Sequence, residues 1–219
     1  MNQSTAVAMR RKQTLAEEAM NAISHGVGLA LAIAALPILV YSAAQKTNTA
    51  GVVGVSLFAS SAILLYFVST LYHALPAGKL KHWFNRLDHS AIYLFIAGSY
   101  MPFLLGVLRG PAGWTMFGLI WAAAAVGVVA KMADVLRHPL LSTGLYVLMG
   151  WMVVFMAVPL YFRMPTAGLL WLVGGGVAYT AGAVVYLFDS KLHFGHFVWH
   201  LFVLAGSTCH FFAALYGQG

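Results

Sequence analysis

The chain has 219 residues, of which 61% are hydrophobic and 8% are charged. Soluble domains carry about 25% charged residues, so this composition excludes a water-soluble globule. The net charge is +7. Basic residues commonly flank membrane helices, and this explains the charge better than binding to a nucleic acid would. We therefore expect no nucleic-acid partner.

Long apolar runs divide the chain into pieces of membrane-spanning length. A helix that crosses the ~30 Å hydrocarbon core needs about 20 apolar residues, whereas strands of a membrane barrel would alternate with a period of two. Unbroken runs therefore predict an all-α bundle of seven transmembrane helices that forms a single domain over residues 1–219. In chain order, the helices are expected over 20–44, 51–75, 86–108, 113–134, 140–162, 167–188 and 196–216.

Basic residues predict how the bundle is oriented. The twelve Lys and Arg residues divide nine to three between the two sides of the membrane, and the side rich in them is normally cytoplasmic. We therefore expect the N-terminal segment 1–19 to be cytoplasmic and the C-terminus to lie outside. The nine are Arg10, Arg11, Lys12, Lys79, Lys81, Arg86, Lys131, Arg137 and Lys191, and the three are Lys46, Arg109 and Arg163.

Small residues and prolines predict details of helix packing. Gly174, Ala178 and Gly182 recur every four residues on the sixth expected helix, a pattern that lets a neighbouring backbone approach closely. Pro37 and Pro159 lie inside expected helices, where each should cause a kink.

Ionisable residues gather at one end of the expected helices. His73 ends the second helix, with Ser69 one turn earlier, and Asp88 lies near the start of the third. His196 and His200 open the seventh helix at a spacing of four, which places them on one face. The alternation of the helices brings all of these ends to the cytoplasmic side. Because buried ionisable groups are costly in a membrane and usually functional, we expect a site there.

Three imidazoles and a water molecule are typical of a catalytic zinc site. The single cysteine, Cys209, provides no thiolate pair, and neutral imidazole suits zinc. Zinc lowers the pKa of its water to about 7. Asp88 could hold or deprotonate that water, and Ser69 could orient the water or hydrogen-bond a carbonyl oxygen. The alternative is that each histidine is a hydrogen-bonded packing residue.

Other polar residues near this end have open roles. Glu18, Asn21 and His25 could cap the first helix, which is the simpler interpretation, or hydrogen-bond the outer shell of the metal site. His193 is a possible spare ligand. His210 lies ten residues beyond His200, or about 15 Å deeper, and is expected to be a packing or pocket-lining residue.

Several stretches of the sequence form a recognisable set of motifs: Glu18, Asn21, His25 and Gly26, STLYH at 69–73, LDHSAIY at 87–93, IAGSYMP at 96–102, Gly150 and Trp151, and His196, His200 and His210. Taken together, these motifs resemble the bacterial hemolysin III family, within the progestin and adipoQ receptor superfamily that includes the adiponectin receptors. The resemblance implies a seven-helix fold with zinc held by His73, His196 and His200, Asp88 engaging the zinc-bound water, and Ser69 beside the site. It also implies a location in the inner (plasma) membrane.

Three functions fit these residues. The first is zinc-dependent hydrolysis of a lipid amide or ester, as the resemblance to related ceramidases implies, with a part in membrane lipid and energy homeostasis. The second is a non-enzymatic membrane sensor or regulator with a structural zinc ion. The third is a haemolytic pore or a transporter. It is disfavoured because a conducting path needs polar groups through the membrane, and only His210 lies deep.

Overall fold

The computed structural model describes residues 11, 13–136 and 138–217. Among them, seven helical spans are long and apolar enough to cross a membrane, and no strand occurs in these ranges. The predicted fold class is confirmed. Arg10, Lys12 and Arg137, which contribute to the charge count, lie outside the described residues, and the orientation in the membrane stays a prediction.

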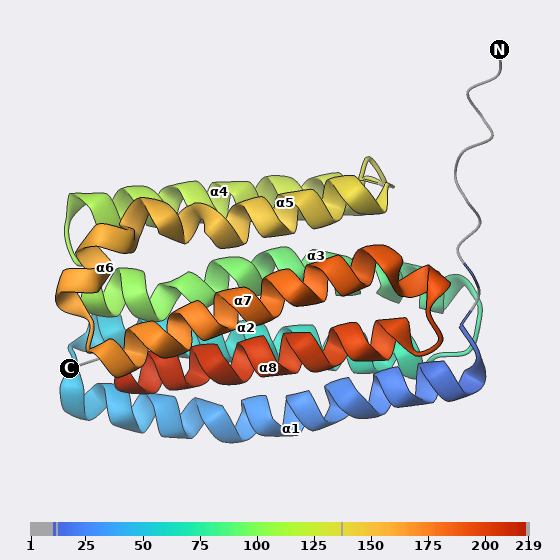
Figure 1. The fold of residues 1–219 in the computed structure, drawn as a ribbon, viewed down its shortest axis with the longest axis horizontal. Helices are drawn as coiled ribbons and strands as arrows, with labels where there is room; N and C mark the ends of the chain where they lie inside the picture. Colours follow the sequence, from blue (N-terminus) through green and yellow to red (C-terminus); the bar gives the residue numbers. More distant parts are fainter. Residues whose placement is uncertain (1–10, 12, 137, 218–219) are drawn as a thin grey trace, which may run out of the picture.

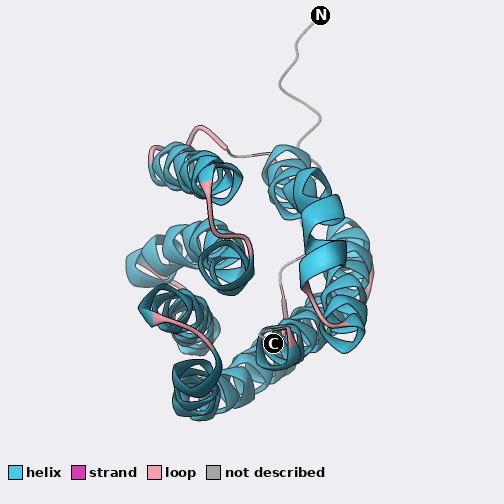
Figure 2. Cartoon of the chain, turned by 90° about the vertical axis from the view of Figure 1, so that its left-hand side faces the viewer, coloured by secondary structure: helices cyan, strands magenta, loops and turns pink. Residues whose placement is uncertain are grey.

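The spans run side by side along the long axis of the molecule, with the start of α1 and the end of α8 at opposite ends of the bundle (Figure 1). Seen end-on, short loops join the helices (Figure 2). The elements are α1 Leu15–Lys46, α2 Thr49–Ala74, α3 Lys79–Met101 with a π-helical end at Pro102–Val107, α4 Pro111–Met132, α5 Pro139–Trp151, a 3₁₀ segment at Met152–Met156, α6 Ala157–Arg163, α7 Thr166–Phe188, a 3₁₀ turn at Asp189–Lys191, and α8 Gly195–Tyr216.

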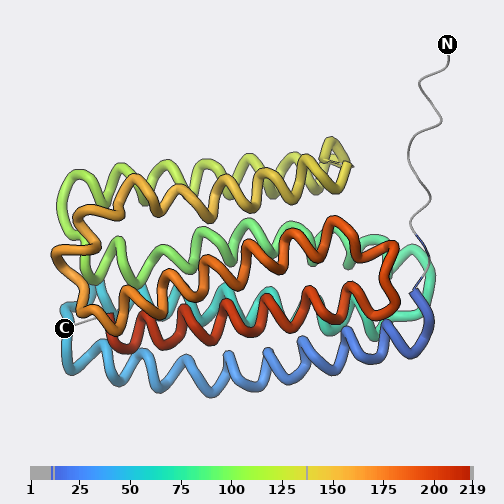
Figure 3. Tube along the Cα trace, in the orientation of Figure 1, coloured from blue at the N-terminus to red at the C-terminus, as the bar shows by residue number. Residues whose placement is uncertain are grey.

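The third span lies at the centre of the bundle. In its most apolar window 72% of residues are buried, compared with 11–50% in the other six spans. Consecutive helices α1 to α4 pack on their neighbours, α7 packs on α8, and α8 returns to pack along α1. The first and last helices consequently lie side by side (Figure 3), which brings their chemistry together.

Helix α3 begins at Lys79, seven residues before the expected start at 86. Its first turns carry Lys79, Lys81 and His82. Because these residues are polar, the sequence predicted that they belong to the loop before the helix. Hydropathy finds only the apolar part of a helix, whereas backbone hydrogen bonds such as His82 N–H to Gly78 O, 3.1 Å, continue through polar turns.

Proline affects two spans differently. Helix α1 is continuous through Pro37, so the structure shows no break at that position. In the fifth span the chain switches to 3₁₀ geometry between Trp151 and Ala157, just before Pro159, which lacks the N–H of a regular helix. The Tyr100 hydroxyl accepts a bond from Val153 N–H at 2.9 Å and so stabilises the break from α3.

Three glycines of α7 face α8 at a spacing of seven rather than the expected four. A methyl group added at Gly168, Gly175 or Gly182 would lie 2.3–2.8 Å from an atom of another segment. Gly182 belongs to the predicted set, but Gly174 is exposed and Ala178 half-buried. Because a seam between two nearly aligned helices repeats every seven residues, the close contact follows that register.

Gly175→Ala should destabilise the protein by roughly 1–3 kcal/mol, the usual cost of overpacking. The added Cβ would lie 2.3 Å from His210 Cδ2 and 3.2 Å from the Gly206 carbonyl oxygen. Thermal unfolding in detergent micelles measures the change. Gly176→Ala is the matched control, since no atom lies within 4 Å of its Cβ position. Equal stability of the two variants would contradict the predicted seam.

Candidate metal centre

Three histidine rings meet at one end of the bundle. His73 comes from the last turn of α2, and His196 and His200 come from the first turns of α8. Their ring centroids are 4.8–5.2 Å apart, and one ring nitrogen of each lies within 4.8 Å of those of the other two. The predicted convergence of these three residues is confirmed.

Carboxylates hold two of the rings through Nδ1. The Glu18 Oε2 atom lies 2.7 Å from His73 Nδ1, and the Asp189 Oδ2 atom lies 2.8 Å from His196 Nδ1. An ionised carboxylate only accepts hydrogen bonds. In the neutral form of both rings the proton is therefore on Nδ1, and Nε2 carries a lone pair.

Neutral oxygens hold the third ring in the same tautomer. His200 Nδ1 lies 3.0 Å from Ser24 Oγ and 3.3 Å from the Asn21 carbonyl oxygen. The Ser24 hydroxyl already donates to that carbonyl at 2.8 Å. Both oxygens therefore accept from His200 Nδ1, and Nε2 again keeps its lone pair.

The three Nε2 atoms fit a metal ion. Each is buried and has no hydrogen-bond partner among the described protein atoms, and a buried polar atom without a partner is costly. A ring whose Nδ1–H is held by an oxygen, with Nε2 left as ligand, is the usual arrangement at metal sites. The centre could therefore hold a metal ion.

The acidic residues of the chain gather at this end of the bundle. The chain has five acidic residues, and four of them, Glu17, Glu18, Asp88 and Asp189, lie near this end of the bundle and are buried or nearly so. The fifth, Asp134, pairs with Arg86 at 3.6 Å. Since acidic groups inside a membrane protein are costly and usually functional, this distribution favours the histidine end as the candidate functional site.

Asp88 and Ser69 are buried beside the histidines. The Ser69 hydroxyl interacts with the Asp88 carboxyl and lies 2.7 Å from His25 Nδ1. The His25 ring stacks on His200, with centroids 3.4 Å apart and an interplanar angle of 7°. Asp88 does not belong to the group of converging ligand atoms. Its predicted action on a water molecule, and the role of Ser69, stay predictions.

The residues of α1 have roles that the sequence left open. The helix is capped by Thr14 and Glu17 in a reciprocal capping box, so Glu18 and Asn21 are not the caps. Glu18 instead bonds His73, and the Asn21 side chain donates to Gln13 Oε1 at 2.7 Å. Glu18 therefore fits the second interpretation, in which it hydrogen-bonds a possible metal ligand rather than capping the helix.

Sequence reasoning missed Asp189 and Ser24. Asp189 stood in a polar connector, and only the scarcity of acidic residues in a membrane chain could have drawn attention to it. His193 is exposed and is not in the histidine group. His210 packs against Gly175 and the Tyr179 ring, in agreement with the packing role predicted for it.

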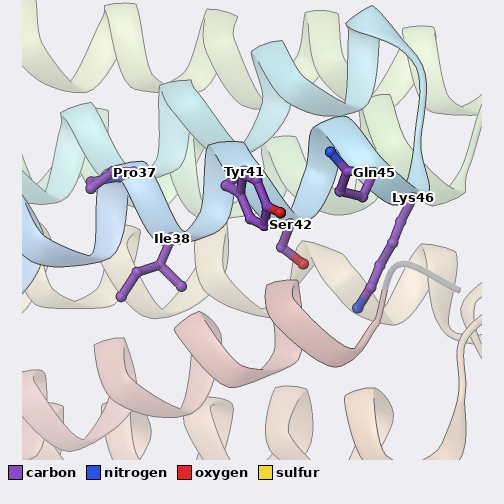
Figure 4. A pocket seen from close by; sticks show the side chains of 6 residues that line it. All are labelled: Pro37, Ile38, Tyr41, Ser42, Gln45 and Lys46. Carbon is purple, nitrogen blue, oxygen red and sulfur yellow. The ribbon is translucent and has the colours of Figure 1, made fainter.

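The described part of the chain has a polar hollow near the histidines and a larger groove far from them. A polar one of ≈ 70 Å³ reaches His196 and includes Arg11, Asn21 and Asp189 in its wall. A groove of ≈ 560 Å³ lies on α1, lined by Pro37, Ile38, Tyr41, Ser42, Gln45 and Lys46 (Figure 4). Tyr41 is twenty residues beyond Asn21 on the same helix, roughly 30 Å at 1.5 Å per residue, so the groove is remote from the histidines.

The fold and the site together define a seven-span membrane protein with a buried three-histidine centre at one end of its bundle. The family model for haemolysin-III-related proteins matches residues 13–211. The chain belongs to this family, and it is a multi-pass protein of the plasma membrane.

Relatives match over nearly the whole chain. Hemolysin-3 of Bacillus cereus is 44% identical over 207 residues, which cover 94% of each chain. The hemolysin-3 homolog of Bacillus subtilis (strain 168) is 42% identical, covering 93% of this chain and 95% of its own. The monocyte to macrophage differentiation factor of Homo sapiens is 30% identical, covering 93% and 85% respectively. The predicted resemblance, including the progestin and adipoQ receptor superfamily, is confirmed.

Proposed function

We propose that this protein binds one zinc ion through His73, His196 and His200 and hydrolyses an amide or ester bond of a membrane lipid. The observation that carries the proposal is the set of three buried Nε2 lone pairs without a partner. Three imidazole ligands leave one of the four positions of a tetrahedral zinc ion open, as in catalytic sites.

The protein's own residues would share the work. When bound, zinc supplies Lewis acidity and activates water at neutral pH. Asp88 accepts the proton of the attacking water and later returns it to the leaving group. The Ser69 hydroxyl, between Asp88 and His25, donates its single proton to the Asp88 carboxylate and so orients it.

Water and lipid would reach the centre by different routes. The polar hollow beside His196 has a volume of ≈ 70 Å³, which is room for water and too little for a lipid. The lipid would enter sideways from the bilayer, between two helices, and so bring the amide or ester bond to the centre. With the orientation that the charges predict, the water route faces the cytoplasm.

Fatty-acid release from lipids tests this proposal. Purified, zinc-loaded protein in lipid nanodiscs should release fatty acid from ceramides or from a native lipid extract, and a chelator should stop the release. Mass spectrometry of the products identifies the lipid class. Absence of release from every class by protein that carries zinc would overturn the proposal.

A second candidate is a membrane sensor or regulator in which the zinc ion is structural. Its ligands come from α2 and α8, so an ion would tie together two helices that both pack along α1. Metal removal should then unfold this end of the bundle, whereas a catalytic ion should leave the fold intact. Circular dichroism and thermal unfolding with and without chelator separate the two cases.

A further inference from the structure

We infer that Asp189 and Glu18 are positioning residues, which hold the His196 and His73 rings in the tautomer that can bind a metal ion. This inference rests on the proposed zinc binding and adds to it the residues that tune the affinity. Its basis is an asymmetry in the centre: two rings are held by carboxylates, and the third is held by neutral oxygens.

The connector before α8 is built to bring Asp189 to His196. Asp189 begins the 3₁₀ turn after α7, and its side chain is 6% exposed. A methyl group at Gly195 would lie 2.9 Å from both Asp189 Cα and its carbonyl oxygen, so only glycine allows this approach. Phe194 has a φ of 56°, and its N–H donates to Glu17 Oε1 at 2.9 Å. Glu17 thereby fixes the start of the helix that carries both His196 and His200.

Glu18 serves the other side of the centre. Its carboxylate bridges His73 Nδ1 at 2.7 Å and Lys81 Nζ at 2.9 Å, and its side chain is 20% exposed. Lys81 and the solvent both weaken its effect on the ring. A cation, Arg11, acts on Asp189 as well, but the Asp189 side chain is less exposed than that of Glu18, so we expect Asp189 to affect metal binding more strongly.

A carboxylate acts on an imidazole in two ways. It keeps the proton on Nδ1, so that Nε2 stays free, and it increases the basicity of Nε2 toward a metal. Without it, the ring can carry its proton on Nε2, and that tautomer does not bind. Loss of such an outer partner typically weakens metal affinity 10- to 100-fold.

Zinc affinity of detergent-purified full-length protein tests the inference, measured by competition with a chromophoric chelator. Asp189→Asn keeps the shape and removes the charge, and it should raise the zinc dissociation constant about 10- to 100-fold. Glu18→Gln should have the same direction and a smaller size. Asp134→Asn is the matched control, because that carboxylate pairs with Arg86, and zinc affinity should not change. Ser24→Ala leaves the Asn21 carbonyl for His200 and should weaken affinity less than Asp189→Asn.

Thermal unfolding of the metal-free variants separates positioning from a general structural role. Weakened zinc binding with the unfolding temperature of the metal-free protein unchanged supports the inference. Wild-type affinity in both Asp189→Asn and Glu18→Gln would overturn it, and so would a lowered unfolding temperature with zinc affinity intact. The wild type distinguishes failure of this inference from failure of the proposed function. If the wild type binds zinc and the variants bind it equally well, only the inference fails. If the wild type binds no zinc, the proposed function fails too.

Discussion

Purified wild-type protein should carry one zinc ion per chain, and the His196→Ala/His200→Ala variant should carry none. The double substitution removes two of the three converging imidazoles, and the remaining His73 cannot hold zinc alone, since such sites need at least three protein ligands. Elemental analysis by mass spectrometry, normalised to protein concentration, measures the ratio. This is the largest effect that the structure predicts.

His193→Ala is the control for this result. His193 lies three residues before His196 in the chain, but it is exposed and is not one of the converging histidines, so the variant should keep its zinc. Retention of zinc by the double variant would place the metal elsewhere. Circular dichroism of the double variant shows whether the helices persist without the ion.

Asp88→Asn should reduce the rate of lipid hydrolysis about 10²- to 10⁴-fold, the usual contribution of a general base, with the zinc content unchanged. Asparagine has nearly the shape of aspartate but cannot accept the proton of the attacking water. Because Asp88 is not among the converging ligand atoms, its loss should not release the metal. Initial rates of fatty-acid release and zinc content, measured on the same preparation, check both parts.

Two further variants test whether a lower rate in Asp88→Asn is specific to that residue. Asp134→Asn makes the same chemical change at a residue paired with Arg86, and its rate should equal that of the wild type. Ser69→Ala should have an effect between the two, because the serine only orients groups around Asp88. An Asp88→Asn variant with wild-type rate would remove Asp88 from the mechanism, and one that loses zinc would make Asp88 part of the metal site.

The number and order of the membrane spans could be predicted from the sequence. Each span is a local property, since a run of about 20 apolar residues must form a helix to satisfy its backbone in lipid. The same local property placed His73 at the end of one span and His196 and His200 at the start of another. Because consecutive spans alternate in direction, those ends had to meet at one face of the membrane. The family resemblance could be recognised from the same residues.

Tertiary structure alone decided the finer features of the centre. Glu18 and His73 are 55 residues apart, Ser24 and His200 are 176 apart, and no local pattern pairs them. The glycine seam on α7 and the contact of Asp189 with His196 depend on how two helices cross and how their connector winds. The apolar pattern of one segment indicates which of its residues face the lipid and which face other helices. It carries no information on which neighbour a buried polar atom will meet, because that depends on the packing of helices that are distant in the chain.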